Sequence, residues 1–493
     1  MPTKPMNLLV LMSDEHTRRM TGCYGHPVVE TPNLDRLAAC GVRFDNAYVN
    51  NPICVPSRAN FITGRYTHDT GNWDNSMPYS GAECQSFGHR LAEQGHQFTT
   101  IGKLHYRYLD DDNGMPDSRL AMNVVDGRGA YWLSMRWNIQ PSNGYLDDVN
   151  NAGAGECSYT RFDRAVAAEA ERWLKNEAAT HDKPWCLLAS FGSPHPPFQV
   201  PQKWLDTYPP GSVDMPINFK LQDWPDHPYW NETRPWRFPV DEDLPEDVIC
   251  NAVATYYGLV SFLDDKLGRV LDALDEAGLT DTTRIIYTSD HGEMLGGHGL
   301  WGKMCMYEDS VAVPLIAAGP DLPAGATCDE NISWVDIFPT VIDGLGAALA
   351  DSDADLPGTS LWPIVRGEES PGRPIFSEYH AAQSPTGNFM LKDERYKYVY
   401  YSGAQYPPQL FDLLVDPTER HDLGRDPAHA DTVARLDAEL RKVCDPDAVN
   451  EAAFADQHAL IDELGGDEAV IARGPTFHST PPPEDFLGAG GKV

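Results

Sequence analysis

One short stretch of the sequence combines residue types that could bind or attack an anion. Cys54 and Arg58 lie at the two ends of the run CVPSR, residues 54–58. Because proline suits the first turn of a helix and Gly64 can end one, we predict a short helix that begins just after Cys54. Such an N-terminus favours an anion, and Arg58 follows one turn later on the same face. Two interpretations compete: a buried structural cysteine, and a nucleophile or anion site.

Candidate metal ligands follow apolar segments that have the pattern of buried strands. Asp14 and Glu15 come soon after the apolar run at 7–12, and Asp290 and His291 directly follow a second such run. In open α/β sheets, ligands bind beyond the carboxyl ends of the strands. Carboxylate oxygens suit a hard divalent cation, and an imidazole shifts the preference toward manganese. Taken alone, Asp14 and Glu15 are equally typical of a solvated turn.

Two further segments place basic side chains beyond predicted strands. Lys103 and His105 follow a strand over 97–101, and residues two apart in an extended segment point to the same side. His195 lies in a proline-rich loop, and the prolines would hold its ring in place. The alternative for His195 is an ordinary histidine in a surface loop.

Three residues in polar or glycine-rich loops complete the candidate set. Asn75 ends a polar loop after the CVPSR run, where an ordinary turn asparagine is an equally good interpretation. His298 and Lys303 belong to the run GGHGLWGK at 296–303. Lys303 is the candidate for binding a substrate, whereas His298 is interpreted either as structural or as a substrate-binding residue.

These residues need a framework that brings the ends of several strands to one edge. Apolar strand patterns alternate with helical patterns through most of the chain, the longest helical pattern being at 248–274. This alternation predicts an α/β fold with a large mixed, mostly parallel sheet flanked by helices. After residue 370, short strands precede one helical pattern at 426–444. We therefore expect a smaller C-terminal α+β subdomain, an antiparallel sheet plus a helix.

The composition restricts the partners and the location of the protein. Its 493 residues include 73 acidic and 38 basic ones, for a formal net charge of -35. Such a surface repels nucleic acid and anionic membranes, so we expect neither as a partner. The ten cysteines are scattered, and the sequence shows neither a secretory signal nor an apolar run of membrane-spanning length. We expect a reduced, cytoplasmic protein.

The motifs together resemble one family. The run CVPSR with Gly64 and Arg65, the element GKLH at 102–105 and the acid and Asp-His pairs after strands are similar to those of the type I sulfatases of the alkaline phosphatase superfamily. That family includes arylsulfatases, choline sulfatases and phosphonate monoester hydrolases. The resemblance covers roughly residues 7–445 in the family's order and implies an alkaline-phosphatase-like fold. Glu15 departs from the family's pattern in its longer side chain.

The resemblance also implies a cofactor set and a mechanism. A maturation enzyme would oxidise Cys54 to formylglycine, and a divalent ion, Ca²⁺ or Mn²⁺ rather than Mg²⁺, would be bound. A metal-bound formylglycine diol would then attack sulfur and form a covalent sulfo-enzyme intermediate. The implied metal ligands are Asp14, Glu15, residue 54, Asp290 and His291. The implied catalytic residues are Cys54, Arg58, Lys103, His105, His195 and Lys303, with Asn75 and His298 on the substrate side.

These observations predict a sulfuric ester hydrolase that acts on a small-molecule sulfate monoester and is arylsulfatase-like. The alternative is a phosphonate monoester or phosphodiester hydrolase with promiscuous sulfatase activity. An alkaline-phosphatase-like phosphomonoesterase is less favoured, because a dianion needs more positive charge and commonly a second metal. A binding protein on an inactive fold conflicts with the full candidate set, and a Cys54 thiolate nucleophile leaves the metal ligands unexplained.

We divide the chain into three parts. Residues 1–370 form the catalytic α/β domain, residues 371–450 the C-terminal subdomain, and residues 451–493 an acidic, proline-containing tail. We expect the tail at an oligomer contact and the protein to be a homo-oligomer, either a dimer or a tetramer.

Overall fold

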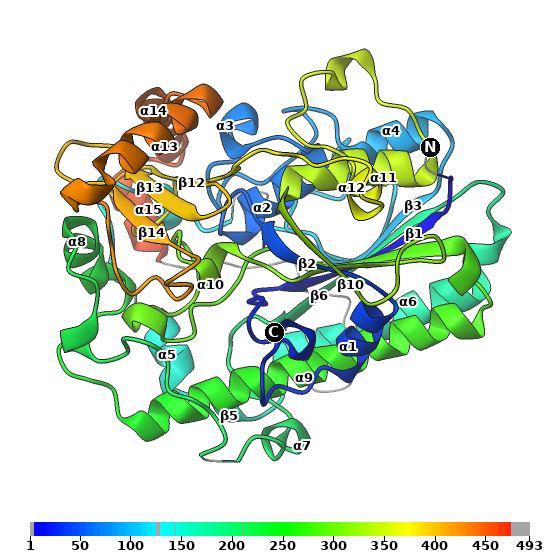
Figure 1. Cartoon of the computed structure of the whole chain (residues 1–493), viewed down its shortest axis with the longest axis horizontal. Coiled ribbons are helices and arrows are strands. Elements are labelled where there is room, and N and C mark those ends of the chain that lie inside the picture. Colours follow the sequence, from blue (N-terminus) through cyan, green and yellow to red (C-terminus); the bar gives the residue numbers. More distant parts are fainter. Residues whose placement is uncertain (1–3, 125–128, 143, 210, 475–493) are drawn as a thin grey trace.

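A large sheet lies at the centre of the computed structural model, which describes residues 4–474 except 125–128, 143 and 210 (Figure 1). In the described part, eight strands pair in the order β10-β2-β9-β8-β1-β6-β3-β4. They are β1 (Asn7–Asp14), β2 (Gly41–Tyr48), β3 (Phe98–Lys103), β4 (Asp117–Met122), β6 (Cys186–Pro194), β8 (Thr283–Ser289), β9 (Leu315–Ala318) and β10 (Ala326–Ser333). Neighbouring strands pair parallel, except that β9 pairs antiparallel with both β2 and β8.

Helices cover both faces of this sheet (Figure 1). On one face lie α1 (Pro32–Ala39), α6 (Ser158–Asn176) and α9 (Glu246–Glu276). On the other lie α2 (Cys54–Thr63), α4 (Phe87–Glu93), α11 (Ile337–Leu345) and α12 (Leu361–Val365). Strand β1 is buried on both faces. Leu9 and Leu11 belong to the apolar cluster that includes residues of α1, α6 and α9, whereas Leu8 and Val10 belong to the cluster that includes residues of α2, α4, α11 and α12. Burial on both faces explains its unbroken apolar run.

The strand register brings the candidate residues to one edge. Ser13 of β1 pairs with Ser289 of β8, so that the residues following both strands emerge together. Asp14 pairs with Pro194 on the other neighbour, β6, directly before His195. The carboxyl ends of three adjacent parallel strands therefore deliver the candidate side chains to one place, as expected for a ligand site in an open α/β sheet.

Shorter elements connect the main helices and strands. The segments between the main elements contain α3 (Thr67–Thr70), α5 (Gly144–Asn150), α7 (Gln202–Leu205), α8 (Pro228–Arg237) and α10 (Glu308–Val311). Two short strands, β5 (Gly153–Ala154) and β7 (Gln199–Val200), pair parallel. Helices α7 and α8 both fall in the proline- and tryptophan-rich stretch after residue 195, which has no clear periodicity in sequence.

The C-terminal part forms its own sheet. Strands β11 (Ile375–Tyr379), β12 (Asn388–Lys392), β13 (Tyr396–Tyr401) and β14 (Gln409–Asp412) pair antiparallel in that order. Helix α13 (Ala430–Val443) packs on it through Leu436 and Leu440. The predicted fold class, a mixed, mostly parallel α/β sheet with a smaller α+β subdomain, is thus confirmed.

Two further helices follow, α14 (Pro446–Glu463) and α15 (Asp467–Arg473). Helix α14 packs against its own chain, where Asp456 accepts a hydrogen bond from Trp73 Nε1 at 2.8 Å and Gln457 donates to Asp74 at 2.9 Å. The predicted tail therefore begins inside helix α14, and residues 475–493 of it lie outside the described part. The three domain boundaries stay a prediction.

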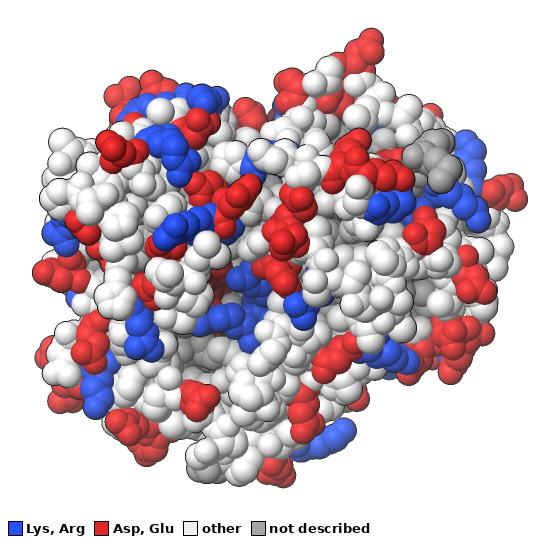
Figure 2. All heavy atoms as spheres, in the orientation of Figure 1, with Lys and Arg blue, Asp and Glu red and all other residues white. Residues whose placement is uncertain are grey.

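The surface charge is uneven. Figure 2 shows Asp and Glu side chains over much of one face, and Lys and Arg side chains around a hollow near its middle, close to α10 in this view. Local positive charge of this kind offsets the strongly acidic composition where an anion approaches.

Candidate active site

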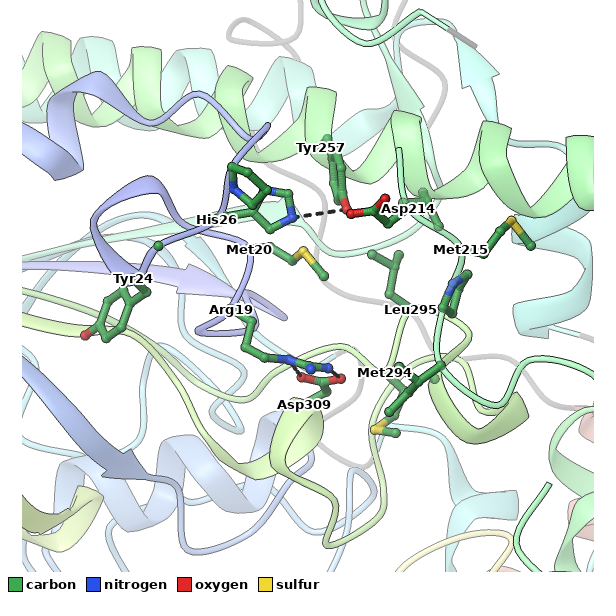
Figure 3. Close-up of a pocket in the computed structure, with 16 residues that line it drawn as sticks. Arg19, Met20, Tyr24, His26, Asp214, Met215, Tyr257, Met294, Leu295 and Asp309 are labelled. Atoms are coloured by element: carbon green, nitrogen blue, oxygen red, sulfur yellow. Dashed lines mark hydrogen bonds and ion pairs between the residues drawn. The ribbon is translucent and has the colours of Figure 1, made fainter. Parts of the chain in front are cut away.

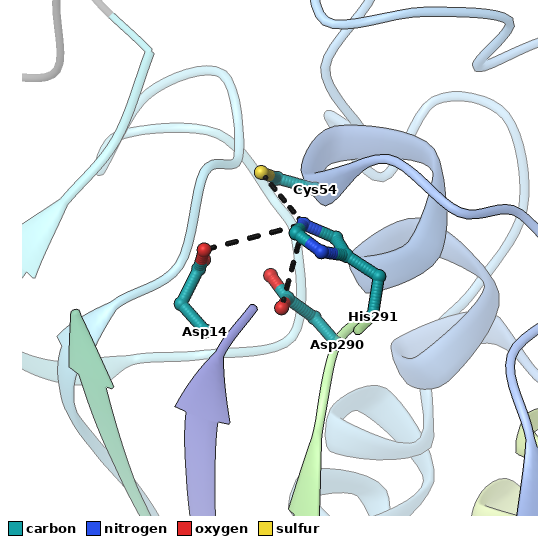
Figure 4. A group of neighbouring side chains, drawn as sticks. All are labelled: Asp14, Cys54, Asp290 and His291. Atoms are coloured by element: carbon teal, nitrogen blue, oxygen red, sulfur yellow. Dashed lines mark hydrogen bonds and ion pairs between the residues drawn. The ribbon is translucent and has the colours of Figure 1, made fainter. Parts of the chain in front are cut away.

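Four buried side chains meet at the edge where β1 and β8 end (Figure 4). Nε2 of His291 lies 3.1 Å from Sγ of Cys54, 3.6 Å from Oδ1 of Asp290 and 4.0 Å from Oδ1 of Asp14. The structure therefore brings together residues from three segments that sequence reasoning joined only through the family resemblance.

The position of Cys54 is set by the start of helix α2. Ile53 is extended, Cys54 is the first helical residue, and Gly64 ends the helix with φ 66°. The helix thus begins at Cys54 and not just after it, a difference within the usual variation of helix ends. Oδ1 of Asn75 accepts a hydrogen bond from the Val55 N–H at 3.0 Å, so Asn75 satisfies a free donor of the helix start beside residue 54.

Burial and the Asp14 carboxylate raise the pKa of the Cys54 thiol to about 12. An unmodified thiol in this setting stays protonated at neutral pH and is a weak nucleophile.

Arg58 ties the ends of β1 and β8 together. Its Nη2 donates to Oδ2 of Asp14 at 3.0 Å and its Nε to Oδ2 of Asp290 at 2.8 Å. Its Nη1 donates to the Lys103 carbonyl at 2.6 Å and to Oγ of Ser190 at 3.0 Å. The fixed guanidinium fork meets four acceptors from different strands, which a lysine could not do.

The two aspartates carry opposite pKa shifts. Burial raises the pKa of Asp14, but the nearby cations, Lys103 foremost with its Nζ 2.8 Å from Oδ2, outweigh burial and hold the pKa well below its usual range. For Asp290, burial and the Asp14 carboxylate raise the pKa to about 7. The described residues thus leave negative charge at this point that a further cation would stabilise.

The donor set fits a divalent metal ion. Oδ1 of Asp14 and Oε1 of Glu15 are buried and receive no hydrogen bond from the described residues. Ligand atoms of Asp14, Cys54, Asp290 and His291 lie within 4.8 Å of one another. Buried carboxylate oxygens without donors are costly unless they coordinate a cation, and oxygen donors suit hard divalent ions.

Glu15 is engaged on its other oxygen. Lys303 Nζ donates to its Oε2 at 2.6 Å, and Nε2 of His195 lies 3.2 Å from the same atom. Asp14, Glu15 and His195 form a second group whose ligand atoms lie within 4.8 Å. The side chain of His195 is 23% exposed, whereas those of Lys303 and Glu15 are 5% and 0% exposed, so solvent reaches the cluster on the His195 side.

His105 belongs to the same cluster of charges. Its backbone has φ 59°, and burial followed by the charges of Lys103 and Arg58 holds its pKa well below the usual range. Lys103 also lies over the ring of Tyr159, 4.8 Å from its centroid. A neutral imidazole in this position could accept a proton.

His298 contacts other parts of the chain. Its ring stacks on Tyr307 with centroids 4.4 Å apart, and Nε2 lies 3.0 Å from the Thr418 carbonyl in the C-terminal part. These contacts favour the structural one of its two interpretations.

The sequence reasoning missed several residues next to the cluster. Oε1 of Glu293 accepts hydrogen bonds from the N–H groups of Leu295 at 2.7 Å and Gly302 at 2.6 Å. Its carboxylate could have been noticed, because it belongs to the run DHGE with Asp290 and His291. Ser190, Tyr145 and Tyr159 carry no comparable signal in the sequence.

A separate cavity lies among residues 19–27, 214–217 and 294–297 and helix α9 (Figure 3). It has a volume of about 350 Å³ and is lined by Met20, His26 and Met294, among others. An ion pair between Arg19 and Asp309 borders it. None of the candidate site residues lines this cavity, so it is distinct from the cluster.

Comparisons with known proteins agree with this geometry. The family described as Sulfatase matches residues 6–347, and the family described as N-sulphoglucosamine sulphohydrolase, C-terminal, matches residues 296–445. The chain is 30% identical over 439 residues to a choline-sulfatase of Rhizobium meliloti (strain 1021), covering 87% of this chain and 84% of the relative. It is 28% identical to arylsulfatase K of Danio rerio, covering 90% and 85%.

Among solved structures, the fold is similar to that of the phosphonate monoester hydrolase of Agrobacterium radiobacter. The TM-score is 0.72 at 27% identity, and the match covers 89% of this chain and 95% of the other.

The chain belongs to the sulfatase family of the alkaline phosphatase superfamily and is a sulfuric ester hydrolase. The predicted family and enzyme class are confirmed. In the part of the chain that the structure describes, no helix is both long and apolar enough to cross a membrane.

Proposed function

We propose that this protein hydrolyses a small-molecule sulfate monoester, in the manner of an arylsulfatase, with a formylglycine derived from Cys54. The observation that carries the proposal is the 3.1 Å contact between Sγ of Cys54 and Nε2 of His291, inside a buried group that also contains Asp14 and Asp290. A nucleophile at the first residue of a helix, beside a metal-ligand set, suits attack on an anionic ester.

Asp14, Asp290 and His291 would hold the divalent ion, and Glu15 is a further ligand candidate because none of the residues that the structure describes donates to its Oε1. When bound, the ion supplies Lewis-acid stabilisation of negative charge and favours deprotonation of a hydroxyl. The oxygen-rich donor set supports Ca²⁺ or Mn²⁺.

The hydrated aldehyde at residue 54 would supply one hydroxyl, ionised beforehand with its proton released to solvent, to attack sulfur, and a second to expel sulfate, with a covalent sulfo-enzyme between the two steps. As the new S–O bond forms, the bond from sulfur to the alcohol oxygen breaks. His195, the most exposed member of the cluster, or Lys303 gives that oxygen a proton. His105 would then take the proton of the second hydroxyl, the C–O bond to sulfate would break, and water would restore the hydrate.

Arg58, Lys103 and Lys303 provide the positive charge that an anionic ester needs. All are nearly excluded from solvent, with side-chain exposures of 2%, 0% and 5%. Charges in such a dry site act more strongly on a developing negative charge than they would in water.

A phosphonate monoester or phosphodiester hydrolase is the second candidate. The fold similarity to the phosphonate monoester hydrolase of Agrobacterium radiobacter supports it, as does the Asp290–His291 pair. To separate the two, the protein is produced together with a formylglycine-generating enzyme, and kcat/KM is compared for a sulfate and a phosphonate ester of one leaving group, 4-nitrophenol. A larger value for the sulfate supports the leading proposal, whereas a larger value for the phosphonate supports the alternative.

A further inference from the structure

Helix α8 carries a buried arginine whose contacts lead to the candidate site. Arg237 is 6% exposed, and its guanidinium donates from all three nitrogens. Nη1 meets the Met304 carbonyl at 2.7 Å, Nε meets the Gln383 carbonyl at 3.2 Å, and Nη2 meets Oη of Tyr229 at 3.1 Å. None of these partners is a carboxylate, although carboxylates are the usual partners of a buried arginine. The positive charge of Arg237 is thus directed at backbone carbonyls.

The first of these carbonyls belongs to the residue that follows Lys303. Met304 has φ 72°, a left-handed conformation that a side chain other than glycine rarely adopts. Its N–H donates to the Pro52 carbonyl at 3.1 Å, two residues before Cys54, and its carbonyl is held by Arg237. Strained backbone persists only where its surroundings fix it, and these two bonds do so.

The residue before Lys303 is fixed as well. The N–H of Gly302 donates to Glu293 Oε1 at 2.6 Å, and its carbonyl accepts from the Met294 N–H at 2.7 Å. The ring of Tyr145 occupies the space above Gly302, since a Cβ there would lie 2.1 Å from Cζ of that ring. The backbone on both sides of Lys303 is therefore held, and its Nζ reaches Glu15 at 2.6 Å.

We propose that Arg237 is a positioning residue for Lys303: by clamping the Met304 carbonyl, it fixes the backbone from which the lysine reaches the substrate. The inference rests on the proposed function, because it assigns Lys303 a part in the reaction. The proline- and tryptophan-rich segment around α8 then also has a role, since Arg237 belongs to it.

Lysine cannot replace Arg237 here. Its ammonium is a compact charge on a flexible stem, whereas the planar guanidinium reaches three acceptors in fixed directions. In Arg237→Lys, the positive charge stays but at least one of the three contacts is lost. Loosening the Met304 carbonyl would let Lys303 shift, and a displacement of about 1 Å of a catalytic group can cost on the order of a hundredfold in rate.

The test is a double-mutant cycle on the full-length matured enzyme, with 4-nitrophenyl sulfate as substrate. The variants are Arg237→Lys, Lys303→Ala and the double variant. We expect Arg237→Lys to lower kcat about a hundredfold in the wild-type background, with a much smaller change in KM. In the Lys303→Ala background, we expect the same substitution to lower kcat by less than about threefold, because the residue it positions is absent.

Arg136 provides a matched control. It is also buried, at 2% exposure, and its partners are the Ser384 carbonyl at 3.1 Å and the side-chain oxygens of Asn450 at 2.8 Å and Gln457 at 3.4 Å. It contacts the same 380–386 loop as Arg237 but not the Met304 carbonyl. Arg136→Lys should therefore leave kcat within about threefold of wild type, even if both arginine variants lower the melting temperature equally.

Equal losses from Arg237→Lys in both Lys303 backgrounds, or an equal loss from Arg136→Lys, would overturn the inference. If Arg237→Lys does not fold, Tyr229→Phe repeats the cycle, because it removes the acceptor of Nη2, together with the hydrogen bonds of the same hydroxyl to Ser384 and Asn388. Its smaller loss of kcat should likewise vanish in the Lys303→Ala background. A wild type that prefers the phosphonate ester corrects the proposed function, and the cycle is then run with that ester. A wild type that cleaves neither ester overturns the function and the inference together.

Discussion

Nη2 of Arg58 lies 3.0 Å from Oδ2 of Asp14, in a contact where the side chains are only 2% and 0% exposed. The same guanidinium reaches Asp290 at 2.8 Å. A single cation thus joins the ends of two neighbouring strands and compensates both aspartates. The arrangement makes Arg58 a structural requirement of the site as well as a charge near the reacting group.

Replacing Arg58 by methionine should strongly destabilise the protein. Asp14 would keep Lys103 as a partner, but Asp290 would remain buried without the guanidinium, and breaking a buried ion pair costs about 3–5 kcal/mol. The free energy of unfolding, measured by urea titration of the metal-loaded protein, should fall by that amount. Arg65→Met is the matched control, because its partner Asp355 is 72% exposed and a surface pair contributes at most about 1 kcal/mol. Similar losses for the two variants would contradict this account of Arg58.

Replacing Cys54 by alanine should abolish sulfatase activity without unfolding the protein. The substitution removes the atom from which the nucleophile is made, so kcat/KM should fall by at least about a thousandfold, the scale on which loss of a nucleophile acts. The melting temperature should change little, because helix α2 keeps its Asn75 contact. Substantial activity in this variant would show that the reaction does not proceed through residue 54.

Removal of the metal should inactivate the enzyme reversibly. Oδ1 of Asp14 and Oε1 of Glu15 receive no hydrogen bond from the described part of the chain, so without an ion the buried carboxylates repel one another. Dialysis against a chelator should lower the melting temperature and abolish activity, and added Ca²⁺ or Mn²⁺ should restore both. The ion content is followed by plasma mass spectrometry. Full activity in protein shown to be free of divalent ions would contradict the proposed metal site.

A second buried network predicts how stability depends on pH. Nδ1 of His68 lies 2.8 Å from Oε1 of Glu378, and Nε2 of His380 lies 2.9 Å from Oε2. Burial lowers the pKa of His68, but the Glu378 carboxylate outweighs it and raises the pKa to about 9 from an ordinary 6.5. Burial likewise raises the pKa of Glu378, but His68 and its other hydrogen bonds lower it to about 2 from an ordinary 4.5.

The pair should therefore stabilise the fold most at mildly acidic pH. The His68 contribution is complete below pH 6.5 and is lost as the pH rises through about 9; the Glu378 contribution is complete above pH 4.5 and is lost as the pH falls toward about 2. His68→Asn should lower the free energy of unfolding by about 3 kcal/mol near pH 5.5 and by clearly less at pH 9.5. The control is His421→Asn, because the side chain of His421 is 78% exposed and not buried like that of His68. A cost of His68→Asn that does not vary between these pH values would refute the prediction.

Much of the fold could be predicted from the sequence, because buried strands and helices show a pattern of apolar residues. The unbroken apolar run of β1 identified a strand covered on both faces, and Asp14 at its end was then placed by the general geometry of α/β sheets. The start and end of α2 followed from Pro56 and Gly64. Local propensity and periodicity act over a few residues, which is the range where sequence reasoning is strongest.

Contacts between distant segments left no such pattern. Arg237 reaches Met304 across 67 positions, and no periodicity links them. His298 lies in the same glycine-rich run as Lys303, which is typical of a site residue, yet its ring stacks on Tyr307. The acidic composition after residue 450 indicates a tail, yet residues 451–463 continue helix α14, which Asp445 caps and Pro446 opens.

A formylglycine at residue 54 is tested most directly by the mass of the proteolytic peptide that carries this residue, from active protein made in a host with the maturation enzyme. We expect a peptide lighter by the difference between a thiol and an aldehyde, which reacts with a hydrazide in proportion to the sulfatase activity. An unmodified Cys54 that is fully alkylatable in active protein would contradict the formylglycine mechanism and leave chemistry at the thiol or at the metal to explain the reaction.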